Sequence, residues 1–214
     1  MTDRTIVRGN LRKNNPPLKS PPRPLGLPQR VRIIGGQYRR TMIPVADAPG
    51  LRPSPDRVRE TVFNWIAHLR PDLHALRGLD LFSGSGALGF ELASRGAQSV
   101  TLVERDTALH GRLVALRDRL GARQVEVIRG DAFTVAARLA PASFDLVFLD
   151  PPFDAGWMPR CLALASTLLA PAGLIYAESP IALDEMDLKN ANLVQIRHGQ
   201  AGRVHFHLLC VQQC

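Results

Sequence analysis

Residues 78–97 read GLDLFSGSGALGFELASRGA, an apolar segment that leads into closely spaced glycines and then into a segment with helical spacing. Glycine suits a tight strand-to-helix turn, because it reaches backbone angles that other residues avoid. We therefore predict a strand that ends near Asp80, a turn built on Gly84 and Gly86, and a helix behind it.

Short apolar runs and helix-length segments alternate over the rest of the chain. The runs are 99–106 (SVTLVERD), 125–131 (VEVIRGD), 144–150 (FDLVFLD) and 173–179 (GLIYAES). Such alternation predicts βαβ units and a parallel sheet that is covered by helices on both faces. Residues 192–211 break the pattern with two strand-like runs around a short turn, which predicts a closing antiparallel hairpin.

Charge is distributed unevenly along the 214 residues. The net charge of +8 comes from the first 60 residues, which hold 13 Lys and Arg against 4 Asp and Glu, whereas the remainder is nearly neutral. Clustered positive charge suits a polyanion such as nucleic acid, because neutralised phosphates release counterions. A basic, solvated tail that only aids solubility is the alternative for residues 1–29.

The chain is expected to divide into three parts. Residues 1–29 hold six prolines among polar and charged residues, which predicts a flexible or extended basic arm. Residues 30–52 alternate around Gly35–Gly36, which predicts a small basic β-hairpin. Residues 53–214 then form the main domain, whose first helix is expected to be capped by Ser54 or Asp56.

Bulk composition is that of an ordinary globular protein, with 45% hydrophobic and 21% charged residues. No apolar run is long enough to span a membrane and the start carries no secretory signal, so the cytoplasm is the expected compartment. The three cysteines lie in no metal-ligand spacing and are expected to be ordinary thiols.

The ends of the first three runs carry candidate cofactor-binding residues. The G-x-G-x-x-G turn lets backbone approach a ligand, and Glu104 can accept hydrogen bonds from two ribose hydroxyls. Both features suit any adenosine-containing cofactor, NAD and S-adenosylmethionine alike. Asp80 favours the latter, because an anion disfavours a pyrophosphate and suits a cationic amino-acid portion. Asp131, Ala132 and Phe133 offer an acceptor and an apolar face to an adenine.

The run at 144–150 stops abruptly in Asp150-Pro151-Pro152-Phe153. The two prolines end the strand and are expected to hold carbonyl oxygens outward, because proline has no N–H and a fixed φ. If Asp150 and the Pro151 carbonyl accept the N–H bonds of an exocyclic amine, its nitrogen is held in line with a sulfonium methyl. Phe153 can stack on the base, which stabilises binding by roughly 1 to 3 kcal/mol. A rigid strand-end turn with a buried phenylalanine is the alternative.

With these motifs the sequence resembles the RsmD family of 16S rRNA guanine-N2 methyltransferases. The resemblance covers about 30–211, and its most specific part is LRPSPDRVRETVFNW at 51–65. It implies a Rossmann-like class I S-adenosylmethionine-dependent methyltransferase fold with a seven-stranded, mostly parallel sheet. It further implies methyl transfer to N2 of one guanine in 16S rRNA, within a 30S subunit or its precursor, by a protein for which a monomer suffices. The arm before residue 30 has no counterpart in the family pattern.

The motifs and the resemblance together assign residues to three roles. Binding of the target base is assigned to Asp150, Pro151, Pro152 and Phe153. Binding of the cofactor is assigned to Asp80, Phe82, Gly84, Gly86, Glu104, Arg105, Asp131, Ala132 and Phe133. Contacts to RNA phosphates fall to Arg32, Arg39, Arg40, Arg52, Arg57 and Arg59. The last three arginines are expected to lie near the site mouth on a lid-like segment, although Arg57 has the alternative of a plain surface charge.

Histidines in the closing hairpin raise the question of a metal. His205 and His207 alternate on one strand and His198 precedes the turn, but the sequence provides no third ligand of recognisable spacing. No metal is therefore predicted, and a solvent-facing or partner-facing strand is expected instead.

Three other functions compete with methylation of rRNA. A DNA adenine-N6 or cytosine-N4 methyltransferase would use the same tetrapeptide, because those bases also present an exocyclic amine. A nucleotide-binding oxidoreductase would use the glycine turn but leaves the Asp-Pro-Pro-Phe segment without a role. An RNA-binding assembly factor would keep the fold without the chemistry, and the intact tetrapeptide argues against it.

Overall fold

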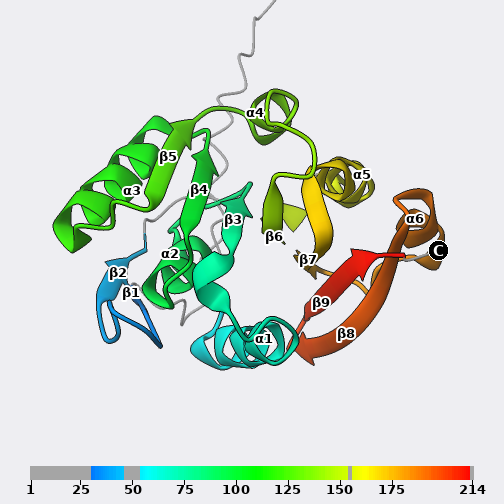
Figure 1. Ribbon diagram of the computed structural model, residues 1–214, viewed down its shortest axis with the longest axis horizontal. Coiled ribbons are helices and arrows are strands. Elements are labelled where there is room, and N and C mark those ends of the chain that lie inside the picture. The colour runs from blue at the N-terminus through cyan, green and yellow to red at the C-terminus, as the bar shows by residue number, and fades with distance from the viewer. Residues whose placement is uncertain (1–29, 46–53, 154–155, 213–214) are drawn as a thin grey trace, which may run out of the picture.

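The structure is a computed structural model that describes residues 30–45, 54–153 and 156–212. The predicted arm at 1–29 and Arg52 lie outside these residues. A seven-stranded sheet has the order β5-β4-β3-β6-β7-β9-β8, and only β9 runs against the other strands (Figure 1). The predicted Rossmann-like fold, with its mostly parallel sheet and antiparallel closing hairpin, is confirmed.

The strands of this sheet are β3 (Arg77–Asp80), β4 (Ser99–Glu104), β5 (Val125–Arg129), β6 (Phe144–Leu149), β7 (Leu169–Ser179), β8 (Leu193–Ala201) and β9 (Val204–Val211). The helices are α1 (Asp56–Leu69), α2 (Ala87–Ser94), α3 (Thr107–Leu120), α4 (Ala132–Ala136), α5 (Met158–Leu168) and α6 (Glu185–Asn190), with a short 3-10 turn at Leu73–Ala75. None of the helices in the described ranges combines the length and apolar character that crossing a bilayer requires.

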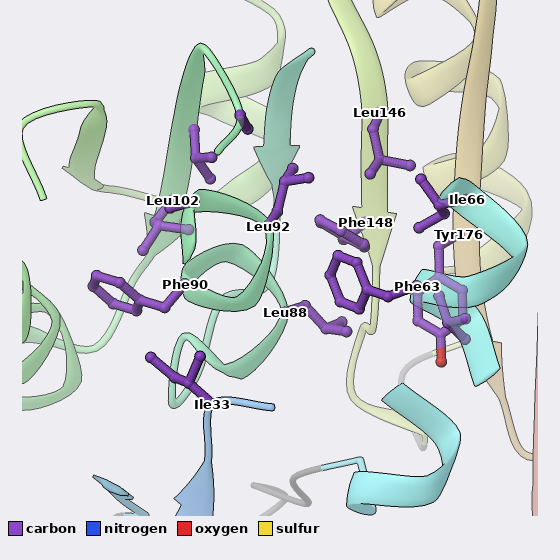
Figure 2. Packing of buried hydrophobic residues seen from close by; sticks show 14 of the residues in the cluster. Ile33, Phe63, Ile66, Leu88, Phe90, Leu92, Leu102, Leu146, Phe148 and Tyr176 are labelled. Carbon is purple, nitrogen blue, oxygen red and sulfur yellow. The ribbon is translucent and has the colours of Figure 1, made fainter. Parts of the chain in front are cut away.

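Two apolar clusters hold helices against the two faces of the sheet. Residues of α1, α2 and α3 form one cluster, and residues of α4, α5 and α6 form the other. In the first, the ring of Phe148 lies 6.0 Å from the rings of both Phe63 and Tyr176 (Figure 2). Each such side chain stabilises the fold by about 1.5 to 3 kcal/mol when fully buried. The central strands are thus covered on both faces, as their nearly continuous apolar sequences predict.

The order of the strands defines where a ligand can enter. From β3 the chain proceeds to β4 on one side, and it later returns to β6 on the other side. In open α/β sheets, a crevice forms at such a switch point, outside the carboxyl ends of the strands. The residues just after β3, β4, β5 and β6 therefore face one common opening.

The basic β-element packs on α2. Its strands β1 (Arg30–Arg32) and β2 (Met42–Pro44) pair in antiparallel register. The connecting loop docks on the last turn of α2, where Ser94 accepts hydrogen bonds from the amides of Gln37 (2.7 Å) and Tyr38 (2.8 Å). Gly36 has a φ of 74°, and a side chain there would collide with the Ser94 carbonyl. Only glycine fits this close approach.

The start of α1 differs from the prediction. Pro55 occupies the N-cap position and no side chain caps the helix, so the expectation that Ser54 or Asp56 would do so is wrong. The Ser54 hydroxyl instead donates a hydrogen bond to the buried carboxylate of Glu178 on β7. Asp56 accepts hydrogen bonds from Arg32 and Arg59. Both side chains therefore make tertiary contacts in place of a local cap.

The closing hairpin brings three histidines together. The register pairs His198 on β8 with His207 on β9, and His205 lies two residues before His207. Their ligand nitrogens lie within 4.8 Å of one another. The register of the hairpin thus brings together three imidazoles that the spacing in the sequence did not identify as a set, and the expectation that no metal binds stays a prediction.

Candidate functional site

A cavity of about 820 Å³ opens at the carboxyl ends of the parallel strands. The predicted site residues that line it are Asp80, Phe82, Gly84, Glu104, Arg105, Asp131, Ala132, Asp150, Pro151, Pro152 and Phe153. Gly86 and Phe133 do not line the cavity. Its wall also includes Ser54, Trp157, Pro180 and Arg203, to which the sequence assigned no firm role. Segments that are distant in sequence thus meet at the switch point of the sheet.

The glycine turn forms one wall, and Glu104 holds it in place. The Gly84 amide donates to one carboxylate oxygen of Glu104 (2.9 Å), and the Asp106 amide donates to the other (2.8 Å). Gly86 begins α2 with a φ of 80°, and a Cβ there would lie 2.7 Å from the side chains of Phe90 and Leu113. A carboxylate offers about four lone-pair sites, so Glu104 retains acceptor capacity for a ligand.

Asp80 and Asp150 line the cavity, and the charge of the buried Glu178 acts on both of them. Burial raises the pKa of Asp80 to about 7, with added repulsion from Glu104 and Glu178, while the Phe82 and Gly89 amides oppose this rise. Burial also raises the pKa of Asp150 well above its ordinary value, and the negative charges of Glu178 and Asp80 raise it further. A cation in this cavity would relieve the repulsion among these carboxylates.

Glu178 is a buried acid outside the cavity lining, and the sequence assigned it no role. It is buried at the end of β7 and accepts a hydrogen bond from the Tyr176 hydroxyl (2.7 Å) as well as from Ser54. Burial raises its pKa, and these two hydrogen bonds and the nearby Arg59 oppose the rise. The available signal was its position, since Glu178 ends a strand of the same sheet, as Asp80 and Glu104 do.

Asp131 lines the cavity just after β5, and Phe133 follows it on α4. Asp131 caps α4 by accepting from the Thr134 amide (3.0 Å), and this hydrogen bond lowers its pKa. Phe133 lies behind the lining, where its ring centroid is 6.2 Å from Phe82 and 5.6 Å from Trp157. The Arg160 guanidinium lies 3.9 Å above the Phe133 ring. The aromatic group gives this side of the cavity a rigid apolar backing.

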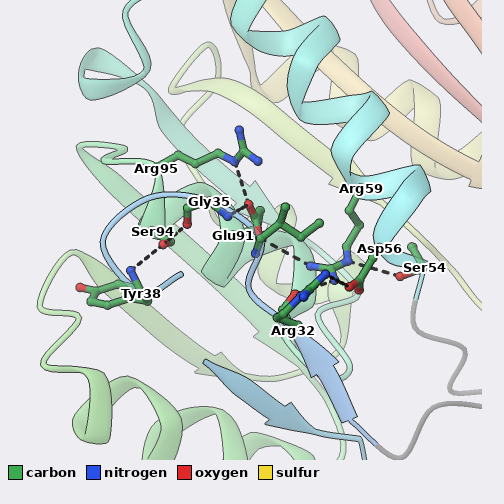
Figure 3. A network of polar contacts seen from close by, with 10 residues as sticks. Arg32, Gly35, Tyr38, Ser54, Asp56, Arg59, Glu91, Ser94 and Arg95 are labelled. Carbon is green, nitrogen blue, oxygen red and sulfur yellow. Dashed lines mark hydrogen bonds and ion pairs between the residues drawn. The ribbon is translucent and has the colours of Figure 1, made fainter. Parts of the chain in front are cut away.

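Arg59 is not a surface residue, contrary to its predicted contact with RNA. Its side chain is fully buried and lies 2.6 Å from Asp56 and 3.6 Å from Glu91, which is also fully buried (Figure 3). Glu91 further accepts hydrogen bonds from the amides of Ile34 and Gly35. Arg59 thus joins α1, α2 and the β-element. It is unavailable to phosphates because its charge is already paired inside the protein.

The other predicted RNA-contacting arginines are distributed differently. Arg32 is half-exposed and pairs with Asp56, and Arg57 is exposed on the first turn of α1. Arg39 and Arg40 are exposed on the loop at the far end of α2 from the glycine turn, so they do not lie at the cavity mouth. Arg203, in the turn between β8 and β9, does line the cavity.

Comparisons with known proteins are consistent with this site. Residues 31–210 match the family described as "Conserved hypothetical protein 95". The chain is 40% identical over 181 residues to "Ribosomal RNA small subunit methyltransferase D" of Escherichia coli. The aligned region covers 84% of this chain and 89% of that protein. The protein of the same name from Haemophilus influenzae is 41% identical over 155 residues, covering 70% of this chain and 78% of that one.

Solved structures share the fold. The yhhF protein of Escherichia coli has a TM-score of 0.71 and 38% identity, and the alignment covers 84% of this chain and 97% of that one. At 15% identity, a structure of SMU.776, described as complexed with SAH, has a TM-score of 0.59 and covers 75% of this chain and 50% of its own. The second likeness extends the fold to more distant proteins.

Proposed function

The chain belongs to the family of ribosomal RNA small subunit methyltransferases D, and we propose that it methylates the exocyclic N2 of one guanine in 16S rRNA. As a member of this family, it is a methyltransferase of small-subunit rRNA that uses S-adenosylmethionine. The proposal of guanine N2 methylation is supported by the position of Asp150-Pro151-Pro152-Phe153 in the wall of the switch-point cavity. This segment places an acidic acceptor and an aromatic ring beside the glycine turn.

The residues of the cavity fit S-adenosylmethionine. Glu104 has acceptor capacity left for ribose hydroxyls, and the turn carries no side chain at Gly84 and Gly86. The acids Asp80 and Glu104, which line the cavity close to each other, make it favourable for a cationic ligand. A pyrophosphate would meet the same acids unfavourably, which argues against NAD. We propose that Asp131, Ala132 and Phe133 hold the adenine. Phe133 would do so indirectly, because it packs behind Phe82 and Trp157, whose side chains line the cavity.

Asp150 is proposed to hold the acceptor amine and to take its proton. When bound, S-adenosylmethionine supplies an electrophilic methyl group: the amine lone pair forms the N–C bond, while the C–S bond breaks with its electron pair left on sulfur. The methylated nitrogen then carries one proton in excess, and the Asp150 carboxylate accepts it. The raised pKa of Asp150 makes this carboxylate a stronger base than an exposed aspartate. Phe153 stacks on the base and fixes its plane.

The substrate is proposed to be a 16S rRNA site within a 30S subunit or its precursor. A guanine in a helix hides its amino group in the stack, so the target must lie in a single-stranded or flexible region or be flipped out. We propose that four exposed arginines contact phosphates of the rRNA backbone, namely Arg32, Arg39, Arg40 and Arg57. All of the proposed catalytic groups come from one chain, so a monomer suffices.

Arg203 should contribute an rRNA phosphate contact close to the cavity. Replacing it by glutamine is expected to weaken rRNA binding several-fold and to lower the slope of log affinity against log salt by about 1. Affinity for S-adenosylmethionine should stay the same. Filter binding over a salt series measures both quantities for rRNA. Arg138→Gln is the matched control, because Arg138 is exposed just after α4. Equal salt slopes for wild type and Arg203→Gln would contradict this contact.

Asp80 should make the unliganded protein less stable as the pH rises. Its folded pKa of about 7 lies above the ordinary 3.8, so the folded state binds the proton more tightly. This stabilisation is complete below pH 4 and is lost as the pH rises through 7, at a cost of the order of 4 kcal/mol. Urea unfolding at pH 5 and pH 8 should therefore show a smaller decline for Asp80→Asn than for wild type. The exposed control Asp118→Asn should decline like wild type, and an equally steep decline for Asp80→Asn would refute the pKa assignment.

A substrate panel tests the proposed function against its DNA alternative. Tritiated S-adenosylmethionine is offered with purified 16S rRNA, assembling 30S particles and duplex DNA containing adenine and cytosine. We expect label in 16S rRNA, naked or assembling, and at most background in DNA. Preferential labelling of DNA would support the adenine-N6 or cytosine-N4 alternative, which the Asp-Pro-Pro-Phe segment also allows.

A further inference from the structure

The histidines of the closing hairpin form a compact set on one face of the sheet. His198 lies directly opposite His207 in the antiparallel register, and His205 precedes His207 by two residues on β9. Residues two apart on a strand, and residues directly opposite each other across a ladder, point to the same face. The backbone thus directs all three imidazoles to one point, as two residues of one strand and one residue of its neighbour.

The imidazole nitrogens lie near enough to one another for a shared metal ion to be reached by movement of the side chains alone. His198 Nε2 and His205 Nδ1 are 3.0 Å apart, and one nitrogen from each of the three rings lies within 4.8 Å of the others. Two nitrogens bound to one tetrahedral Zn²⁺ at 2.0 to 2.1 Å are about 3.3 Å apart. The three rings lie nearly parallel, with interplanar angles of 6°, 15° and 17°, and His198 and His205 share a hydrogen bond. Binding one ion therefore requires the side chains to rotate until their three lone pairs converge.

The surroundings of His207 fix its ring in the form that a metal requires. His207 is fully buried, and its Nδ1 lies 2.6 Å from Gln195 Oε1. An amide oxygen only accepts hydrogen bonds, so Nδ1 carries the hydrogen. Nε2 lies 3.4 Å from the Ser179 hydroxyl, which donates its own hydrogen to the Ile181 carbonyl, so Nε2 keeps its lone pair. Metal-binding histidines commonly donate their second ring N–H to such an acceptor, which orients the ring. His198 is exposed and His205 is half-buried, so the set is open to solvent on one side.

We propose that His198, His205 and His207 bind one divalent transition-metal ion of the Zn²⁺ type. Imidazole nitrogens suit zinc, copper and nickel, whereas Mg²⁺ and Ca²⁺ prefer the oxygen ligands that this set lacks. Three protein ligands leave a fourth position for water. The ion would cross-link the edge strand β8 to β9 and would restrict the motion of the turn that carries Arg203. This site is separate from Asp150 and supplies no group to methyl transfer.

The test uses the full chain without a histidine tag, freed of metal by a chelator. Titration calorimetry with ZnCl₂ is expected to give one Zn²⁺ per chain. At free Zn²⁺ of about 100 times Kd, the unfolding temperature should rise by roughly 5 to 10 °C. Substituting Co²⁺ should give a visible spectrum of nitrogen ligation with low coordination number. Absence of Zn²⁺ binding by the wild type would overturn the proposal.

Variants at the accessible ligands separate the proposed site from other zinc-binding groups. His198→Gln and His205→Gln are each expected to weaken Zn²⁺ binding at least tenfold and to remove the thermal shift, while metal-free unfolding stays close to wild type. The matched control His110→Gln lies on α3 and should bind like wild type. Retention of full Zn²⁺ affinity in both His198→Gln and His205→Gln would place the metal elsewhere, for example on cysteine thiols, and would overturn the assignment.

Discussion

Replacing Asp150 by alanine is expected to lower kcat for methyl transfer to 16S rRNA by roughly 10²- to 10⁴-fold, which is the usual contribution of a positioned general base. The variant loses both the acceptor that holds the amine and the group that takes its proton. Affinity for S-adenosylmethionine should stay within a few-fold, because the proposed cofactor contacts lie on β3, β4 and β5. Single-turnover assays together with equilibrium binding of the cofactor measure the two effects separately.

Two further variants make this prediction specific. Asp150→Asn keeps one acceptor oxygen but cannot take a proton, so its activity should fall between those of wild type and Asp150→Ala. Asp145→Asn is the control, because Asp145 lies at the other end of β6 and pairs with Arg77. It should leave the rate of transfer unchanged. The role of Asp150 would be contradicted if Asp150→Ala lost cofactor affinity and activity in equal proportion. Removing the half-buried carboxylate of Asp150, which the charge of Glu178 repels, should not unfold the protein.

Replacing Glu91 by glutamine is expected to destabilise the fold by about 3 to 5 kcal/mol. Glu91 is fully buried and accepts hydrogen bonds from the Ile34 and Gly35 amides and from Arg95 Nε (2.8 Å). A glutamine would turn a donor toward one of these donors and would leave Arg59 with less compensating negative charge. Removing one partner of a buried ion pair typically costs this much. Urea unfolding gives the change in free energy, provided that the slope with denaturant stays constant.

Controls for Glu91 follow from its partners. Glu126→Gln, at an exposed position on β5, should change stability by less than about 0.5 kcal/mol. The double variant Glu91→Gln, Arg59→Met should be less destabilised than the sum of the two single variants, because the two side chains share one network. A loss of less than 1 kcal/mol for Glu91→Gln would show that the buried network is not needed to join the β-element to α2.

Much of the fold and of the cavity could be predicted from local signals. Asp80, Glu104 and Asp150 each follow an apolar run, and parallel strands bring their carboxyl ends to one edge. The same rule places Glu178, at the end of β7, near this edge of the sheet, so its position is readable from the GLIYAES run.

Arg59 shows where a residue-type assumption overrode a pattern. Its position matches the apolar spacing of Val62, Phe63 and Ile66, so helical periodicity places it on the buried face of α1. The expectation of a phosphate contact instead placed its guanidinium near the site mouth. Its partners, Asp56 and Glu91, come from the start of the same helix and from α2, and the second could not be inferred without the tertiary fold.

The histidine set depended on a register that the sequence left open. β8 contains an irregularity between Gln195 and Arg197, which shifts the residues that face β9. Counting pairs from the open end of the hairpin, where Leu193 pairs with Val211, therefore gives the wrong partner for His198. The short turn at Gly202, with a φ of 61°, is the better origin, because counting outward from it pairs His198 with His207.

The choice of guanine over other bases rests on family membership, because any exocyclic amine fits between an acidic acceptor and an aromatic ring. The most direct measurement is therefore the chemical identity of the product. 16S rRNA methylated by this protein is digested to nucleosides and analysed by mass spectrometry against standards, with Asp150→Ala as the blank. We predict N2-methylguanosine as the only new nucleoside, at no more than one per rRNA. New N6-methyladenosine or N4-methylcytidine without N2-methylguanosine, or a product of equal yield from Asp150→Ala, would contradict the proposed chemistry.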